Sequence, residues 1–373
     1  MGLPDGILGA AWPQMRTELG VGLNDNWRML ALGTCGSALS SFSSGLALRR
    51  FGVGRVLVAT TFVTALAILG YAHSATLTLI TVLAFALGLG NGAIDAGLNS
   101  FVASNLSSRH MSWLHACWGV GVSFGTLIVS GILATGGTWR GAYLAIGIVQ
   151  LTLAFAFVSQ LRQLPQATRG SADGEASDHP SIGATLKLRA SWVSMGAFFA
   201  YCGLECSAGL WIASALHDGR GWTTAAAGLM ATLFWASLTL GRFLIGAISQ
   251  RFQAIRIVKA AAFGALVGSL LIATSSTLGQ HQTAAGVITA TGLLIAGFSL
   301  SPIYPMLMHD TVRRVGAGHA TNLIGFQGGV GQLGFALIPA AVGALLQAQS
   351  TEWLGAVLTA LAITLLALVW YKP

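Results

Sequence analysis

Long apolar stretches separated by short polar breaks run along the whole chain. A membrane-spanning helix needs roughly 20 apolar residues, and cutting the sequence at its polar breaks gives about twelve stretches of that order. They cover residues 1–15, 28–48, 54–73, 77–102, 111–135, 140–161, 188–216, 222–248, 255–275, 284–308, 319–347 and 352–371. The pattern predicts an all-α integral membrane protein with twelve spans and a shortened first helix.

One longer polar segment divides these stretches into two sets of six. Residues 163–186 are rich in Ser, Gly, Ala and acidic residues, as a flexible connector is. We therefore predict a six-helix bundle over residues 1–162, a cytoplasmic connector over 163–186 and a second six-helix bundle over 187–373. Asp178 and His179 resemble an acid/base pair, but a solvated connector offers them no rigid support.

Composition supports membrane embedding. Hydrophobic residues make up 54% of the chain and charged residues 8%, against roughly 25% charged residues in a soluble domain. A soluble globular protein is excluded. The 49 glycines fit helices that pack closely in a bilayer.

The net charge of +8 follows from topology, because the basic residues are distributed unevenly between the connections. Four of the 19 basic residues, Arg16, Arg28, Arg140 and Arg220, lie on one side of the predicted bilayer. The other side holds Arg49, Arg50, Arg55, Arg109, Arg162, Arg169, Lys187, Arg189, Arg242, Arg251, Arg256, Lys259, Arg313, Arg314 and Lys372. The positive-inside rule places the C-terminus in the cytoplasm, in a bacterial-type inner membrane. The lipid bilayer, and not a nucleic acid, is the expected partner.

The two halves share a motif at corresponding places. Residues 45–55 and 246–256 both follow G-x-x-x-x-R-F-x-x-x-R, and parallel six-helix repeats around a central site are a known transporter architecture. The 45–55 segment is similar to the G-x-x-x-D-R-x-G-R-x-R signature of the major facilitator superfamily. WPQM (12–15), GLGNGAIDAGLNSFVA (88–103), LHACWGVG (114–121), GRFLIGAISQRF (241–252) and GFSLSPIYPM (297–306) resemble its fucose-permease-like group of sugar:proton symporters.

The signature departs from the family pattern in two places. Arg49 stands where the family has an acidic residue, and Val53 occupies the following basic position. Residues expected to act in a conformational loop are Gly45, Arg50, Gly52, Arg55, Arg242 and Arg251. A simpler interpretation of the arginines, as inside-positive loop residues, remains open.

Three acids lie deep in apolar stretches, where a charged group is unfavourable and is a functional candidate by default. They are Asp5, Asp95 and Glu205. The resemblance implies that acids of the first and fourth helices, here Asp5 and Asp95, take part in proton coupling. A neutral acid that bridges helices is the alternative for each.

Polar and aromatic residues inside the predicted helices indicate a solute site. Asn91, Asp95 and Asn99 recur every four residues and form one polar stripe. Indole rings inside helices suit stacking on a sugar, although packing is an alternative for each. The expected substrate-binding residues are Asn91, Asn99, His115, Trp118, Tyr201, Trp211, Trp235, Asn322 and Gln327.

Other features are assigned to gating or to packing. Pro302 and Pro305 interrupt a helix and either gate a pathway or kink the helix. The glycine-rich runs 88–92, 119–125 and 325–331 lack the strand context and G-K-[ST] ending of nucleotide loops and are assigned to close helix packing. Cys35, Cys117, Cys202 and Cys206 are read as packing residues, and we expect no metal and no cofactor.

These features together predict a secondary active transporter, not an enzyme, that moves a sugar or polyol with a proton by alternating access. The alternatives are a proton-driven exporter of amphipathic or cationic compounds, sodium coupling through the stripe, and a non-transporting membrane sensor. We expect a monomer. Because residues 1–15 reach only about 22 Å as a helix, we also expect the natural chain to begin upstream of Met1.

Overall fold

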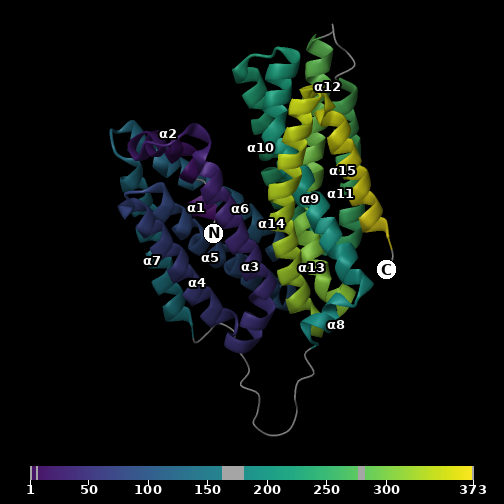
Figure 1. Cartoon of the computed structure of the whole chain (residues 1–373). Helices are drawn as coiled ribbons and strands as arrows, with labels where there is room; N and C mark the ends of the chain where they lie inside the picture. Colours follow the sequence, from purple (N-terminus) through teal and green to yellow (C-terminus); the bar gives the residue numbers. More distant parts are fainter. Residues whose placement is uncertain (1, 6, 162–179, 276–281, 372–373) are drawn as a thin grey trace. The chain divides into compact units, whose positions relative to one another are not determined.

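The chain is helical throughout in the computed structural model, which describes residues 2–5, 7–161, 180–275 and 282–371. Figure 1 shows the helices along the chain. They are α1 (Gly2–Asp5), α2 (Ile7–Leu19), α3 (Trp27–Phe51), α4 (Val53–His73), α5 (Leu77–Asn105), α6 (Ser108–Ala134), α7 (Trp139–Gln160), α8 (Ile182–Leu186), α9 (Arg189–Ser214), α10 (Thr224–Ile248), α11 (Ala254–Ser275), α12 (Gln282–Leu300), α13 (Ile303–Val315), α14 (Ala317–Ala348) and α15 (Leu354–Trp370). No strand occurs within these ranges, which confirms the predicted all-α fold.

Ten helical segments of the described chain are long and apolar enough to cross a membrane, and α12 with α13 counts as one of them. The first expected span corresponds to α1 and α2, which end at Leu19 and thus a few residues later than predicted. Most of the expected connector, with Asp178 and His179, lies outside the described residues. Its last part forms the short helix α8.

The described chain forms two compact units. Unit 1 consists of residues 1–101, 117–182 and 317–329, and unit 2 of 102–116, 183–316 and 330–373. Each unit therefore combines segments from both sides of the connector, because 102–116 packs with the C-terminal helices and 317–329 with the N-terminal ones. The predicted division into bundles 1–162 and 187–373 stays a prediction.

Two glycines form equivalent tight links between helices. Gly52 joins α3 to α4 with φ 78°, and Gly316 joins α13 to α14 with φ 80°. Both follow paired arginines, in R-R-F-G-V-G and R-R-V-G-A-G. A positive φ is strained for a residue with a Cβ, so glycine is favoured at both links.

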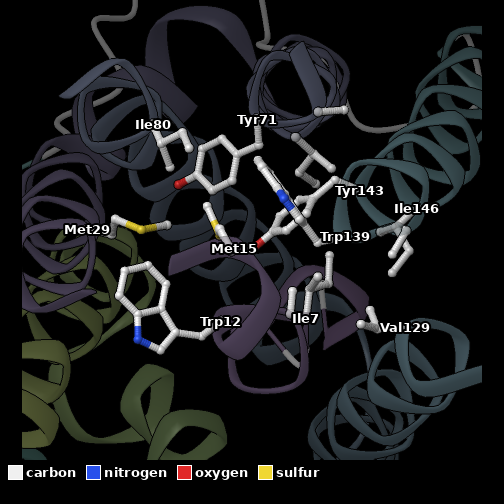
Figure 2. Packing of buried hydrophobic residues seen from close by; sticks show 14 of the residues in the cluster. Ile7, Trp12, Met15, Met29, Tyr71, Ile80, Val129, Trp139, Tyr143 and Ile146 are labelled. Atoms are coloured by element: carbon white, nitrogen blue, oxygen red, sulfur yellow. The ribbon is translucent and has the colours of Figure 1, made fainter. Parts of the chain in front are cut away.

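The apolar core of unit 1 is built around α2. Ile7, Ala11 and Met15 recur every four residues, lie on one face and are fully buried. Figure 2 shows this face packed against side chains that include Tyr71, Trp139, Tyr143 and Ile146. The first helix is thus fixed by its packing, although its span is short.

Glycines let α3 and α5 approach to backbone contact. A Cβ on Gly88 would lie 2.0 Å from the carbonyl oxygen of Gly33, and one on Gly92 would lie 2.2 Å from that of Ser37. On the facing helix, a Cβ on Gly36 would lie 2.3 Å from the carbonyl oxygen of Phe85. This confirms close packing as the role of the 88–92 run.

Glu18, near the end of α2, ties that helix to α7. Its carboxylate accepts a hydrogen bond from Nε of Arg140 at 2.8 Å and another from the indole N–H of Trp139. The guanidinium of Arg140 also lies 4.3 Å from the centre of the Trp139 ring. These interactions, led by the Arg140 hydrogen bond, hold the pKa of Glu18 below its ordinary value.

We expect this contact to make stability depend on pH at the acidic end. Because the folded pKa of Glu18 is lowered, its contribution is present above the ordinary glutamate pKa of about 4.3 and is lost as pH falls through the lowered value. The measurement compares the Tm of the wild type with that of Glu18→Gln in detergent between pH 7 and pH 3. The Tm difference should shrink on acidification; a difference that stays constant would contradict the assignment.

Candidate functional site

The exposed carboxylate of Asp5 is the centre of a polar cluster in unit 1. Trp118 Nε1, on α6, donates a hydrogen bond to Asp5 Oδ2 at 2.8 Å. Asn91 Nδ2, on α5, donates to Asp5 Oδ1 at 3.3 Å. Asp5, predicted for proton coupling, is thus hydrogen-bonded to Asn91 and Trp118, which were both predicted for substrate binding.

Glycines bring α1 against α6 and so place Asp5 beside Trp118. A Cβ on Gly2 would lie 2.0 Å from the carbonyl oxygen of Trp118, and one on Gly125 would lie 2.2 Å from that of Leu3. Backbones that approach this closely leave no room for a side chain. The glycine-rich run 119–125 therefore has a packing role that also positions the acid.

The predicted polar stripe on α5 continues away from this cluster. Asn91 and Asp95 are half-buried, and Asn99 is fully buried. A Cβ on Gly328 of α14 would lie 3.6 Å from Ser41 Oγ and 3.8 Å from Asp95 Oδ2. The stripe therefore passes from Asp5 towards a part of unit 1 bordered by α3 and α14. Gln327, on α14, is fully buried.

Arg49, which departs from the family pattern, has a specific contact in unit 1. Its Nη1 donates to the carbonyl oxygen of Pro180 at 3.1 Å, and Nδ2 of Asn322 donates to the same oxygen at 3.2 Å. A Cβ on Gly45 would lie 2.5 Å from Asn322 Oδ1. Arg49 thus donates to a carbonyl oxygen, which an ionised acidic residue could not do and would repel.

The remaining residues of the predicted conformational loop lie at helix ends. Gly52 forms the link described above, Arg50 lies over the Phe51 ring at 5.5 Å, and Arg55 is exposed. Arg251 is exposed in a short 3-10 turn after α10. Their role in locking the conformation stays a prediction.

Unit 2 contains a buried ion pair. Glu205, on α9, is 2% exposed, and the Arg242 side chain, on α10, is 7% exposed. Arg242 Nη2 lies 3.4 Å from each Glu205 carboxylate oxygen, and the Tyr201 hydroxyl donates to Glu205 Oε2. Arg242 lies within α10, six residues before that helix ends, in agreement with the expected span 222–248, and its part in a conformational loop stays a prediction.

Side chains from α6, α9 and α13 surround this ion pair. Ser112 Oγ donates to the backbone oxygen of Arg242 at 2.7 Å. The His115 ring centre lies 4.7 Å from that of Tyr304, which also packs against Phe198 at 4.8 Å. The predicted residues His115, Tyr201 and Glu205 thus belong to one cluster.

Two other tryptophans predicted for the solute site take part in helix packing. Trp211 Nε1 donates to the carbonyl oxygen of Pro339 at 2.9 Å. A Cβ on Gly209 would lie 2.2 Å from the Trp235 ring, so this ring rests directly on α9. Stacking of either ring on a solute stays a prediction.

The predicted helix interruption is present between α12 and α13. Ser301 and Pro302 form the turn between these helices, and Pro305 is buried in the first turn of α13. Tyr304 lies between the two prolines, and its ring packs against those of His115, Phe198 and Tyr201. The break therefore orients a side chain of the cluster, and its gating role stays a prediction.

The described residues contain no group of three or more His, Cys, Asp or Glu side chains that could hold a metal ion. No disulfide joins any of Cys35, Cys117, Cys202 and Cys206.

Three residues of these clusters were not among the predicted site residues. They are Ser112, Pro180 and Tyr304, each of which meets partners from distant segments. The position of Tyr304 between two prolines is the one local signal that could have singled it out. Ser112 and Pro180 carry no such signal.

Comparisons with known proteins agree with this architecture. Residues 1–339 match the sequence profile of the Major Facilitator Superfamily. Bypass of stop codon protein 6 of Saccharomyces cerevisiae is 23% identical over an alignment 395 residues long, gaps included. The alignment covers 99% of this chain and 79% of the yeast protein.

Two solved structures share the fold. The E. coli fucose:proton symporter FucP is 14% identical, with a TM-score of 0.74 and coverage of 100% of this chain and 96% of FucP. A bacterial homologue of the iron transporter ferroportin is 14% identical, with a TM-score of 0.74 and coverage of 99% and 94%. The predicted resemblance to the fucose-permease-like group is thereby confirmed at the level of the fold. A matching profile over most of the chain, and a fold shared with solved transporters, show that the chain belongs to the Major Facilitator Superfamily.

Proposed function

We propose that the chain is a secondary active transporter that moves a small polar solute, a sugar or polyol, together with a proton. The observation that carries the proposal is the Asp5 cluster. An exposed carboxylate on an apolar helix contacts an indole and an amide, which supply an apolar face and polar groups for a solute. The fold shared with a fucose:proton symporter is consistent with this function.

Proton coupling is proposed to run through Asp5, with Asp95 and Glu205 as further acids. A membrane potential of 100 mV supplies about 2.3 kcal/mol per charge, which supports roughly fiftyfold accumulation of a neutral solute per proton. We propose that the protein is a monomer in a bacterial inner membrane, with its C-terminus in the cytoplasm. Transport is proposed to occur by alternating access between its two six-helix bundles. Sodium in place of the proton is the alternative coupling ion.

An exporter of amphipathic or cationic compounds is the second candidate function. The observation in its favour is that Asp5 and Trp118, in direct contact, are both exposed, and Trp118 is 37% exposed. A carboxylate beside an indole face is a suitable site for an organic cation. Dye accumulation in cells with and without expression separates export from import.

Asp5→Asn is expected to abolish accumulation driven by a proton gradient. The amide keeps the shape of the side chain and an acceptor for Trp118, but it does not carry a proton. The measurement is uptake of labelled fucose and sorbitol into proteoliposomes, with an internal pH dye to record proton entry. We expect the accumulation ratio to fall from tens to about one.

Asp25→Asn is the matched control, because the half-buried Asp25 pairs with the exposed Arg28 at 3.3 Å in a short turn before α3, away from the Asp5 cluster. It should leave accumulation unchanged. Solute-dependent proton entry that persists in Asp5→Asn at the wild-type rate would exclude Asp5 as the carrier. Uptake that depends on sodium at fixed pH would instead favour sodium coupling.

A further inference from the structure

The guanidinium of Arg242 is incompletely satisfied. Both contacts with Glu205 come from Nη2 and measure 3.4 Å, whereas charge-assisted N–H···O bonds typically measure about 2.7–2.9 Å. The Nε atom is buried and has no hydrogen-bond partner among the described residues. A buried N–H group without an acceptor is unfavourable, because it has lost its hydrogen bonds to water. The site therefore has donor capacity for a better-placed anion.

The Glu205 carboxylate is shared between two partners. It accepts a hydrogen bond from Tyr201 and lies beside Arg242, so it does not form the two parallel bonds of a bidentate ion pair. Arginine binds a planar carboxylate best in this bidentate geometry. Glu205 thus neutralises the charge of Arg242 through Nη2 alone, and the guanidinium does not form two parallel hydrogen bonds with it.

Aromatic groups complete the surroundings of this site. Tyr201, Phe198 and His115 lie around the Tyr304 ring, with ring centres 4.7 to 6.0 Å from it. His115 is half-buried, whereas Tyr201 and Phe198 are fully buried. Among these three residues, His115 alone keeps part of its surface accessible.

We propose that Arg242 binds a carboxylate of the transported solute and that Glu205 takes up a proton when this carboxylate binds. The solute class is then a polyhydroxylated carboxylic acid, such as a sugar acid. This inference rests on the proposed transport function and specifies its substrate.

Charge balance explains why the two events are coupled. Arg242 and Glu205 are neutral as a pair, and a solute carboxylate added to them would leave one net negative charge in a low-dielectric interior, which is strongly unfavourable. A proton on Glu205 restores neutrality, since Arg242 then pairs with the solute. The protonated Glu205 remains beside Tyr201, whose hydroxyl is both a donor and an acceptor.

The proton is assigned to Glu205 after comparison with every titratable or charged group around the pair. These groups are Tyr201, Cys202 and Cys206 on α9, Arg242 on α10, His115 on α6 and Tyr304 on α13. Arginine stays protonated in proteins, and the thiols and phenols are neutral at pH 7. A proton on His115 would add a second positive charge beside Arg242, so Glu205 is the acceptor that the geometry favours.

The first test uses the wild-type protein and matched pairs of solutes. Thermal shift and equilibrium binding are measured for gluconate against sorbitol, and for glucuronate and galacturonate against glucose and galactose, from pH 5.5 to pH 8. We expect at least one acid to bind at least tenfold more tightly than its neutral partner. Its affinity should fall about tenfold per pH unit where Glu205 is ionised, because one proton enters with it. Equal binding within every pair, tighter binding of the neutral members, or no binding of any acid would overturn the proposal.

Substituted proteins separate the two roles. In Glu205→Gln, Arg242 has no internal counter-ion, so acid binding should persist and vary less than twofold with pH. In the double variant Glu205→Gln/Arg242→Gln the site is neutral, and acid affinity should drop at least tenfold. A Glu205→Gln protein that keeps the full pH dependence would exclude Glu205 as the proton acceptor.

Failure of this inference differs from failure of the transport function. Neutral sugars that drive proton entry with no preference for acids would leave the proposed function intact and remove Arg242 as a carboxylate site. Acids that bind with the expected pH dependence but move no proton across the membrane would leave the site intact and remove coupled transport.

Discussion

Gly88→Leu is expected to destabilise the protein strongly. A Cβ at Gly88 would lie 2.0 Å from the carbonyl oxygen and 2.9 Å from the carbonyl carbon of Gly33 on α3. Because both contacts are with backbone atoms, no side-chain rotation relieves them, and α3 must move away from α5. Overpacking typically lowers the free energy of unfolding by about 1–3 kcal/mol, and we expect this substitution at or above the upper limit. The measurement is the Tm of the detergent-solubilised protein, together with its elution profile on size exclusion.

Gly131→Leu is the matched control for this substitution. Gly131 lies within α6, and a Cβ there would meet no atom within 4 Å. Gly131 lies in the last turn of α6, and replacing glycine with leucine in a helix is favourable by up to about 1 kcal/mol, so the Tm should hold or rise. Similar Tm values for the two variants would show that the α3–α5 approach is looser than the contact distances indicate. If α5 shifts in Gly88→Leu, we expect the hydrogen bond from Asn91 to Asp5, one turn further along α5, to be disturbed as well.

The helical architecture could be predicted because the bilayer imposes it locally. A span must satisfy its backbone groups within itself, so hydropathy along the sequence indicates where the long apolar helices lie. The break at Ser301 and Pro302 is local for the same reason, since proline lacks an N–H donor. The end of α2 was less predictable, because Arg16 and Glu18 mark a polar boundary in the sequence while the helix continues to Leu19.

The partners within the clusters could not be predicted from local pattern. The contact of Asp5 with Trp118 joins residues 113 positions apart, and it depends on how closely α1 approaches α6 at Gly2 and Gly125. Depth in an apolar helix marked Asp5 as a candidate, and an interior indole marked Trp118, but neither signal pairs the two. Stacking of Trp118 on a solute stays a prediction, and the structure adds a contact that the sequence did not indicate, the hydrogen bond from its N–H to Asp5.

The surroundings of Arg242 could not be predicted from its charge and its position in the sequence. Basic residues near helix ends are assigned to the cytoplasmic side by the positive-inside rule, and Arg242 lies six residues before α10 ends. The arginine side chain is long enough to turn back into the unit, where Glu205 of α9 neutralises it. Whether such an arginine is solvated or forms a buried ion pair depends on whether the facing helix carries an acid, as α9 does with Glu205.

The second large effect is expected from breaking the Glu205–Arg242 ion pair one residue at a time. Removing one partner of a buried pair typically lowers the free energy of unfolding by about 3–5 kcal/mol, because an uncompensated charge is left behind. Glu205→Gln should lie at the upper end, since an arginine cannot lose its proton. Arg242→Gln should have a smaller effect, because the remaining carboxyl can take up a proton.

A double-mutant cycle tests this asymmetry. Replacing both residues with Gln removes the charges together, so the double variant should be more stable than Glu205→Gln, with an interaction free energy of about 1–3 kcal/mol. Asp25→Asn is the control, because 29% of the Asp25 side chain and 52% of the Arg28 side chain are exposed, and pairs open to solvent contribute about 0–1 kcal/mol. The free energy of unfolding is measured by denaturant titration in detergent micelles. Additive losses would mean that each side chain has separate partners, and the pair would then not be the unit that holds the charge of Arg242.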